Sequence, residues 1–259
     1  DTERLLKETD GYLQAQATFF GSLVVDPNAA VVSDLSKRRE ELLVSRIGST
    51  GKGTGAALAA KVMREPGAVA VHPGNLSGFG DTIDVYKYYF TGSEQVLVEV
   101  SQGFSLSLNA SMMYPYTTSR DCTVTQAIAD AGIHPSMYRD CMMVVRTFPI
   151  RVAGNSGPGY EDQKEISWDD LGVEPELTTV TKKVRRVFTW SIDQFQTAVH
   201  FNRPSTVFVN FMNYLAPGVD HDQWLIDNVV KPYRNVMNTD PVLLLGYGPR
   251  NEDVKGWRV

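Results

Sequence analysis

Short runs of apolar residues, rich in valine and leucine, alternate along the chain with segments of helical periodicity. Runs of this length are typical of strands that are buried on both faces of a largely parallel sheet. The predicted strands lie at residues 22–26, 68–72, 95–101, 141–146, 206–211 and 241–248. The predicted helices lie at residues 30–46, 55–64, 123–133 and 193–201. The alternation therefore predicts an α/β fold with a central, largely parallel sheet.

Length and composition agree with one globular domain over residues 1–259, in which 42% of the residues are hydrophobic and 21% are charged. The net charge of -5 argues against a general nucleic-acid surface. No apolar run reaches the roughly 18 residues of a membrane helix, and the first residues lack the pattern of a secretory signal. Cys122 and Cys141 show no spacing typical of a disulfide or a metal site. We therefore expect a cytoplasmic protein with free thiols, whose Gly- and Pro-rich segment 153–176 is a surface excursion or lid.

A glycine-rich stretch, "GSTGKGTG", precedes the helix predicted at 55–64. It is not a Walker A loop, because Lys52 lies between two glycines and Arg46 stands where the motif needs its first glycine. Ser49, Thr50 and the glycine amides before a helix are nevertheless suited to hold a single phosphate. A glycine-rich turn without a ligand is an equally good interpretation of these residues alone.

Two polar loops follow predicted strands, where open α/β sheets bind their ligands. In the loop within 98–123, Gln102 has an amide that can read a base edge, and Thr118 and Ser119 can bind a phosphate. Alternatively, Ser119 caps the helix that follows. In the segment 243–253, a strand followed by a glycine turn, Gly246 and Gly248 permit close approach of a base or ribose.

A cluster of basic and hydroxyl side chains lies within residues 177–190 of this acidic chain. Such a cluster offers the donors that a dicarboxylate or a phosphate requires, although a charge run is more often a solvated face. Its members are Thr178, Thr179, Thr181, Lys182, Lys183, Arg185 and Arg186. The four histidines have no spacing typical of metal ligands or of a catalytic triad.

Taken in order, these segments resemble the adenylosuccinate synthetase family. "IGSTGKGTGAALAAKVMR" is similar to that family's "IGTTGRG...KVAR", "VEVSQGFSLSLN...YPYTTS" to its "EGAQG...YPYVTSS", and "LLLGYGP" to its "ISTGP". "QGFSLSLN", "YPYTTSRDCT", "PELTTVTKKVRRVF" and "FVNFMNYL" are more similar still to the bacteriophage branch, the N6-succino-2-amino-2'-deoxyadenylate synthases. The resemblance covers nearly the whole chain and implies a P-loop-NTPase-like fold.

The resemblance implies a ligase that joins L-aspartate to a purine nucleotide. A nucleoside triphosphate, with Mg2+, phosphorylates the purine O6, and the aspartate amine then displaces phosphate. The implied site residues are Ser49, Thr50, Arg64, Gln102 and Thr118 for dGMP; Thr178, Thr179, Thr181, Arg185 and Arg186 for aspartate; and Asn210, Asn213, Gly246, Gly248 and Pro249 for ATP. Arg64 is expected to reach into a partner subunit's site, which implies a homodimer.

Two departures from the ordinary family favour the bacteriophage branch. Where ordinary members have "TKLD", whose carboxylate binds guanine, this chain has "NFMN" with Asn213 at the acidic position, so ATP or dATP is the expected donor. Val184 interrupts the basic run near an arginine that contacts the ribose hydroxyl, which a deoxynucleotide tolerates. The alternatives are an IMP- and GTP-using synthetase and an inactive nucleotide-binding module.

A third departure concerns the family's N-terminal "GDEGKGK" loop and the histidine-containing segment after it, neither of which has a counterpart here. The catalytic acid–base residues are expected in that segment. We therefore expect that the sequence is a fragment of a longer chain, that another polypeptide supplies the segment, or that activity has been lost.

Overall fold

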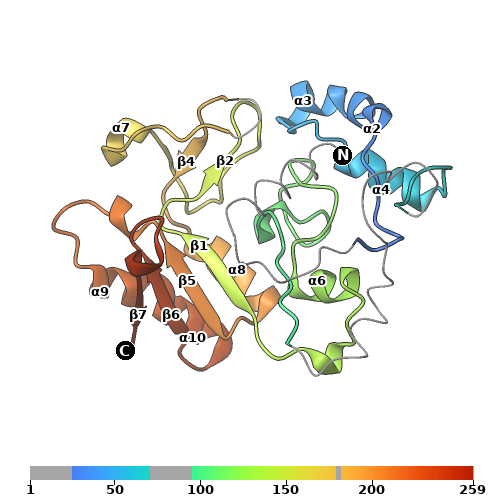
Figure 1. The fold of residues 1–259 in the computed structure, drawn as a ribbon. Helices are drawn as coiled ribbons and strands as arrows, with labels where there is room; N and C mark the ends of the chain where they lie inside the picture. Colours follow the sequence, from blue (N-terminus) through green and yellow to red (C-terminus); the bar gives the residue numbers. More distant parts are fainter. Residues whose placement is uncertain (1–24, 71–94, 179–181, 259) are drawn as a thin grey trace. The chain divides into compact units, whose positions relative to one another are not determined.

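The structure is a computed structural model that describes residues 25–70, 95–178 and 182–258 (Figure 1). The contacts within the chain define two compact units: unit 1 comprises residues 1–46 and 51–97, and unit 2 comprises residues 47–50 and 98–259. Each unit is described by itself below, and the single domain expected over residues 1–259 stays a prediction. Among the described residues, no helix combines the length and the apolarity that crossing a bilayer requires.

The described part of unit 1 is helical, with α2 (Asp34–Arg39), α3 (Glu41–Ile47) and α4 (Thr54–Val62). The helix predicted at 30–46 is therefore two helices, which Glu40 separates, and the helix predicted at 55–64 is confirmed as α4. The strand predicted at 68–72 contributes one β-bridge, between Val69 and Ala30, in the described residues. The strand predicted at 22–26 lies largely outside them.

Glu40 is buried, and its carboxylate binds the N-terminus of α4. One carboxylate oxygen accepts a hydrogen bond from the Gly53 amide at 2.7 Å, and the other accepts from the amides of Gly55 at 2.6 Å and Ala56 at 3.0 Å. A carboxylate is stabilised there by the unpaired amides and by the helix dipole. A glycine is required at position 53, because Gly53 has a φ of +80° and a Cβ there would lie 2.8 Å from the backbone nitrogen of Lys37. The amides that the sequence offered to a phosphate thus bind a carboxylate of the chain itself.

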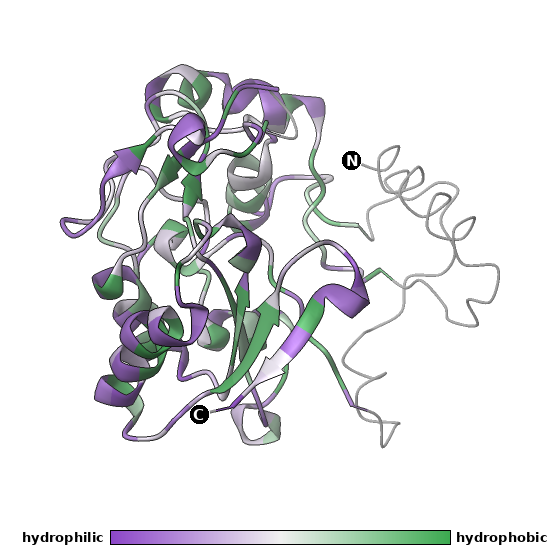
Figure 2. Ribbon diagram, turned by 90° about the vertical axis from the view of Figure 1, so that its left-hand side faces the viewer, coloured by the Kyte–Doolittle hydropathy of each residue, from purple (hydrophilic) through white to green (hydrophobic). Residues whose placement is uncertain are grey.

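The larger sheet of unit 2 has the order β1-β5-β6-β7. Its parallel strands are β1 (Met142–Arg146), β5 (Thr206–Asn210) and β6 (Val242–Gly246), and β7 (Val254–Trp257) runs antiparallel to β6. The strands predicted at 141–146, 206–211 and 241–248 are confirmed. The strand predicted at 95–101 is wrong, since these residues are described and form none. In Figure 2 the hydrophobic colour runs along the central strands, whereas the strand next to the C-terminus is partly hydrophilic.

Helices pack on this sheet and enclose its core. They are α8 (Ile192–Asn202), which confirms the helix predicted at 193–201, and a long helix formed by α9 (His221–Leu225), the π-helical η4 (Ile226–Val230) and α10 (Lys231–Met237). The π turn ends two residues before Pro232, which has no amide hydrogen to donate. The core side chains are Phe195, Val199, Val207, Val209, Met212, Leu225, Val229, Val230, Tyr233, Leu243 and Leu245.

A second, antiparallel sheet has the order β2-β4-β3, with β2 (Ile150–Arg151), β4 (Arg186–Phe188) and β3 (Glu165–Ile166). The expected surface excursion at 153–176 thus contains a strand and the short helix α7 (Trp168–Leu171). Trp168 is buried, and its indole nitrogen donates to the Arg185 carbonyl at 2.7 Å. This packing connects the excursion to the basic segment that follows it.

The remaining elements of unit 2 are short. They are α6 (Val124–Asp130), within the helix predicted at 123–133, and the 3-10 turns η1 (Phe104–Leu106), η2 (Pro135–Met137), η3 (Met212–Tyr214) and η5 (Asn251–Asp253). The expectation that Ser119 caps the helix is wrong, because the Thr123 hydroxyl accepts the hydrogen bond from the Gln126 amide at 3.2 Å. Asn202 of α8 also accepts from the Val124 amide at 2.9 Å, which fixes α6 against α8.

The contacts of Glu40 predict the effect of a nearly isosteric change. Glu40→Gln removes the negative charge and turns an amide nitrogen toward backbone donors, so the start of α4 should lose about 1–3 kcal/mol of local stability. Hydrogen–deuterium exchange of residues 53–60 measures this loss as faster exchange. Glu65→Gln is the matched control, since Glu65 forms an exposed ion pair with Arg39. Equal exchange in the two variants would contradict the role of Glu40.

Candidate functional site

The carboxyl ends of β1, β5 and β6 meet at one edge of the larger sheet. Arg146 ends β1 and lies in register with Asn210, which ends β5. Gly246 ends β6 beside Asn210, and a Cβ on that glycine would collide with the Asn210 side-chain oxygen. Loops at this edge of parallel sheets are the usual place for a ligand. Two predicted ATP-binding residues, Asn210 and Gly246, therefore lie in contact there.

The loop that follows β5, residues 210–214, has a strained backbone. Phe211 has a left-handed conformation, with φ of +63°, which is uncommon for a bulky residue. The Asn210 side chain accepts a hydrogen bond from the Phe211 amide at 2.9 Å, and the buried Thr147 hydroxyl donates to the Phe211 carbonyl at 2.7 Å. These bonds hold the loop against the turn after β1, and Asn213 is exposed on it.

The turn after β6 carries the other predicted ATP-binding residues. Gly248 lies against the Asp253 carboxylate, which accepts a hydrogen bond from the Arg250 amide at 3.0 Å. Pro249 is exposed between them. The turn is thus closed by the chain itself, and the glycine is needed because a Cβ would lie 2.5 Å from a carboxylate oxygen.

The predicted aspartate-binding residues form a hairpin, residues 176–186. A β-bridge joins Leu177 to Val184, and the Thr178 hydroxyl accepts from the Lys183 amide at 3.0 Å. Thr178 is buried by this arrangement. Thr179 and Thr181, at the tip of the hairpin, lie outside the described residues.

Arg185 and Arg186 differ in their surroundings, as neighbours in an extended segment do. The Arg186 guanidinium binds both Glu165 oxygens, at 2.8 and 2.6 Å, and also donates to the Ser156 hydroxyl at 3.1 Å and the Gly157 carbonyl at 2.6 Å. Hydrogen bonding to Arg186 lowers the pKa of Glu165, and the same contact raises the pKa of Arg186. Arg185 donates from Nε to the Leu177 carbonyl at 3.3 Å, and its two terminal nitrogens donate to no described residue.

The segment 151–158 connects the predicted residues of several motifs within unit 2. Gly48, which precedes the predicted Ser49 and Thr50, packs against the backbone carbonyls of Ala153 and Asn155. The backbone at Gly157 packs against the Tyr116 ring, and Arg151 donates to the Tyr116 carbonyl at 3.2 Å. Because Arg186 also binds this segment, the "GST" turn, the "YPYTTS" loop and the basic hairpin all reach it.

Gln102 and Thr118, both predicted to contact the nucleotide, are brought together by the structure. The Gln102 amide nitrogen donates to the Thr118 hydroxyl at 2.8 Å, and the Gln102 oxygen accepts from the Cys122 thiol at 3.8 Å. Gln102 has a φ of +74°, so a strained backbone holds its side chain in this place. Burial raises the pKa of the Cys122 thiol, which keeps it protonated as a donor.

Arg64, the remaining predicted residue, belongs to unit 1. It follows α4 in a left-handed conformation, with φ of +59°, and is exposed. The other predicted residues that the structure describes lie in unit 2.

Sequence reasoning missed a group of side chains beside this edge: Arg146, Glu176, Phe211 and Tyr214. Arg146 binds the Glu176 carboxylate through two nitrogens, at 2.5 and 3.3 Å, and its guanidinium carbon lies 3.6 Å from the centre of the Phe211 ring. The Tyr214 hydroxyl donates to Glu176 at 3.2 Å. Burial, followed by the Glu176 charge, raises the pKa of Tyr214. The available signal was a charged residue at the end of a predicted strand.

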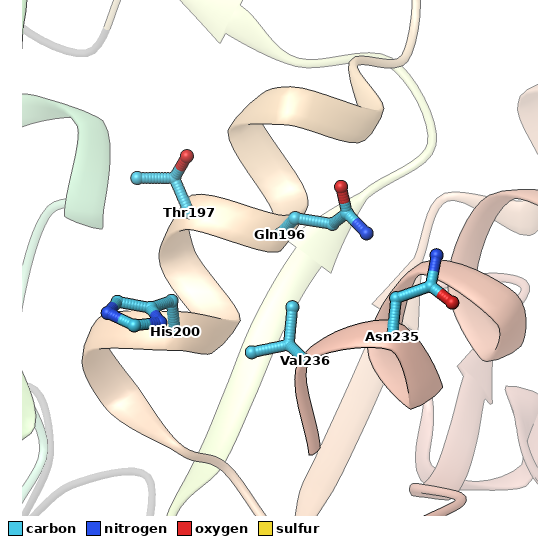
Figure 3. A pocket seen from close by; sticks show the side chains of 5 residues that line it. All are labelled: Gln196, Thr197, His200, Asn235 and Val236. Carbon is cyan, nitrogen blue, oxygen red and sulfur yellow. The ribbon is translucent and has the colours of Figure 1, made fainter. Parts of the chain in front are cut away.

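An open pocket of about 290 Å³ lies elsewhere, between α8 and α10. Figure 3 shows the side chains that line it: Gln196, Thr197, His200, Asn235 and Val236. None of them was predicted from the sequence as a site residue. Among the described residues, no three His, Cys, Asp or Glu side chains converge as metal ligands.

Comparisons with known proteins identify the family of the chain. The family model described as adenylosuccinate synthetase matches residues 76–217. The N6-succino-2-amino-2'-deoxyadenylate synthase of Vibrio phage phiVC8 is 39% identical over 242 residues, which are 90% of this chain and 70% of that protein.

Two solved structures are similar to the whole described fold. The succinoaminodeoxyadenylate synthetase of Cyanophage S-2L, bound to dGMP and to dATP as an energy donor, superposes with a TM-score of 0.78 at 34% identity, over 95% of this chain and 73% of that one. Adenylosuccinate synthetase from Plasmodium falciparum has a TM-score of 0.76 at 15% identity, over 99% and 82% of the two chains, and this likeness concerns the fold alone. The expected α/β fold of the synthetase type is thus confirmed, and the chain belongs to the adenylosuccinate synthetase family.

Proposed function

We propose that the protein is a ligase that joins L-aspartate to C6 of dGMP, using ATP or dATP as phosphoryl donor. The products are N6-succino-2-amino-2'-deoxyadenylate, the nucleoside diphosphate and phosphate, on the route to 2-aminoadenine DNA. One observation carries the proposal: the similar Cyanophage S-2L enzyme is bound to dGMP and dATP, and its fold matches 95% of this chain. The proposal places the reaction in the cytoplasm of an infected host cell.

The reaction requires positioning and charge neutralisation more than a covalent enzyme intermediate. Phosphorylation of the purine O6 makes it a leaving group, and the aspartate amine then replaces it at C6. For dGMP we propose Ser49 and Thr50 at the phosphate, with Gln102 and Thr118 at the nucleotide. The contact between Gln102 and Thr118, at 2.8 Å, supports their belonging to one subsite.

For the donor we propose Asn210, Asn213, Gly246, Gly248 and Pro249, which lie on the loops after β5 and β6. Asn213 is exposed and carries an amide, which can both donate to and accept from adenine. A carboxylate at the same position would accept the two donors of guanine. This difference supports an adenine nucleotide as donor.

Mg2+ is proposed as a companion of the donor phosphates. Such ions are usually held by one or two carboxylates together with the phosphates. The described residues contain no cluster of three potential ligands, so they do not fit a site built by the protein alone. No step of the proposal is therefore assigned to Mg2+ on these residues.

For aspartate we propose the hairpin 176–186, with Thr178, Thr179, Thr181 and both arginines. The contacts divide the work between the arginines. Arg185 has two terminal nitrogens that no described residue occupies, whereas Arg186 is bound by Glu165, Ser156 and Gly157. These contacts support Arg185 as the arginine that binds a substrate carboxylate, and Arg186 as the one that holds the hairpin in place.

The proposed reaction has a direct test in phosphate release by the full-length protein. With aspartate present, dGMP plus ATP should give a kcat/KM about tenfold or more above that of IMP plus GTP, because the purine and donor subsites read different hydrogen-bonding groups. Preference for IMP and GTP would show an ordinary synthetase instead. Tight dGMP binding without phosphate release would show an inactive nucleotide-binding module.

Asn213→Asp supplies the matched variant for the donor arm of that assay. The carboxylate should lower the use of ATP and raise the use of GTP, since it accepts the guanine donors. If the ratio of kcat/KM for ATP to kcat/KM for GTP does not change, Asn213 does not contact the donor base.

The two arginines predict different effects on substitution. Arg185→Ala should raise the KM for aspartate about tenfold or more with little change in thermal stability, because a hydrogen bond to a charged group contributes about 1.5–3 kcal/mol. Arg186→Ala should lower the melting temperature, because it removes the guanidinium that binds the Glu165 carboxylate, the Ser156 hydroxyl and the Gly157 carbonyl. Steady-state kinetics measure the KM for aspartate, and thermal melting measures the stability, in each of the two variants. A lower melting temperature in Arg185→Ala with unchanged KM would reverse the assignment.

The proposed homodimer assigns Arg64 to the dGMP site of the partner subunit. Arg64 is exposed, so Arg64→Ala should leave the fold and the thermal stability unchanged while weakening dGMP binding, because a charge at the phosphate is lost. Isothermal titration with dGMP, together with sedimentation velocity, tests both parts. Lys61→Ala, in the last turn of α4, is the control. A monomer, or normal dGMP affinity in Arg64→Ala, would contradict the proposal.

A further inference from the structure

Four side chains from three separate segments form a closed ring of contacts in unit 2. Arg146, at the end of β1, contacts both Glu176 and Phe211, and Tyr214 contacts the same two residues. The Phe211 and Tyr214 rings lie 5.0 Å apart. Glu176 begins the hairpin 176–186, whereas Phe211 and Tyr214 belong to the loop 210–214. The ring therefore joins these two segments through Arg146.

The contact with the loop 210–214 depends on the planar shape of the guanidinium. The Arg146 carbon lies 3.6 Å from the centre of the Phe211 ring, which is the geometry of a stacked cation–π contact. Phe211 has a left-handed backbone, with φ of +63°, which is strained for such a residue. The Phe211 ring thus lies under the Arg146 guanidinium. Asn213, which is exposed, follows Phe211 by two residues on the same loop.

The contact with the hairpin 176–186 depends on the fork of the same guanidinium. Two Arg146 nitrogens bind the two Glu176 oxygens, and the Glu176 carbonyl accepts a hydrogen bond from the Arg185 amide at 2.8 Å. Glu176 therefore fixes the backbone of the proposed aspartate-binding arginine. Movement of the Arg146 guanidinium would therefore displace both the loop 210–214 and the hairpin 176–186.

A role in stability alone does not account for this choice of residues. Arg146 and Glu176 are 21% and 24% exposed at their side chains, so both charges are largely removed from water. Replacing such a pair by apolar side chains is often neutral or stabilising, because desolvation offsets the attraction. The pair lies at the edge of the sheet where ligands bind, and it spans two proposed subsites.

We propose that Arg146 is a positioning residue that couples the donor loop, 210–214, to the aspartate hairpin, 176–186. The inference depends on the proposed function for the identity of the two substrates. According to this inference, the Arg146 guanidinium sets the geometry of the donor loop and of the aspartate hairpin together. Occupation of one subsite then favours the geometry that the other substrate needs, and by linkage the effect is reciprocal.

The test compares kinetics of the wild-type protein with those of Arg146→Lys, which keeps the charge but loses the fork and the stacked plane. The KM for aspartate and the KM for ATP should both rise about fivefold or more. Tyr214→Phe, which removes only the hydroxyl contact to Glu176, should change both constants in the same direction by less. In the double variant the increases should be smaller than the product of the single ones, because both act through Glu176.

Arg234→Lys is the matched control. Arg234 of α10 also binds a carboxylate through two nitrogens, which both contact one oxygen of Asp240, at 2.8 and 2.7 Å, and this pair touches neither segment. The Arg234→Lys substitution should leave the KM for aspartate and the KM for ATP unchanged. A rise in only one KM in Arg146→Lys, or unchanged KM values with a lowered melting temperature, would overturn the coupling.

Hydrogen–deuterium exchange separates this inference from the proposed function. If the wild-type protein does not turn over dGMP, aspartate and ATP, the proposed function fails, and the coupling is judged by exchange alone. Exchange should increase in residues 182–186 and 211–214 together in Arg146→Lys, and in neither in Arg234→Lys. An increase confined to one of the two segments would overturn the inference.

Discussion

Parallel pairing of β1, β5 and β6 is the constraint on which the other features of the site depend. The register places Arg146 opposite Asn210, and Val209 opposite Leu245, so that the three strands end together. Their following turns must then lie side by side, and the Thr147 hydroxyl bonds one turn to the next at Phe211. Buried valines and leucines on these strands hold the register, because a slip of one residue would move them out of the core.

Glutamates of the chain bind groups that are suited to anions. Glu40 binds the amides at the start of α4, Glu165 binds Arg186, and Glu176 binds Arg146. Partly buried cations and helix ends are costly without a partner, so a carboxylate of the chain stabilises each of them. Arg185 differs from the neighbouring Arg186, because no described residue accepts a hydrogen bond from the terminal nitrogens of Arg185.

The segment 151–158 explains how motifs far apart in the sequence become neighbours in unit 2. It packs against Gly48, holds the "YPYTTS" loop through Arg151 and Tyr116, and binds Arg186 through Ser156 and Gly157. The Gly157 backbone approaches the Tyr116 ring so closely that a Cβ would lie 2.7 Å from it. A polar, glycine-rich composition is thus the result of close backbone packing as well as of surface exposure.

The sequence by itself determined the α/β class, three of the parallel strands and the order of the family motifs, because apolar periodicity and turn residues act locally. It also determined that Gln102 and Thr118 belong to polar loops, whereas their 2.8 Å contact follows only from the folded chain. The contacts that distinguish Arg185 from Arg186, the carboxylate of Glu40 at α4, and the ring around Arg146 were decided by the tertiary structure. Glu40 lies 13 residues from Gly53, Arg186 lies 21 residues from Glu165, and Arg146 lies 30 residues from Glu176. Periodicity carries no information about partners that are so far apart along the chain.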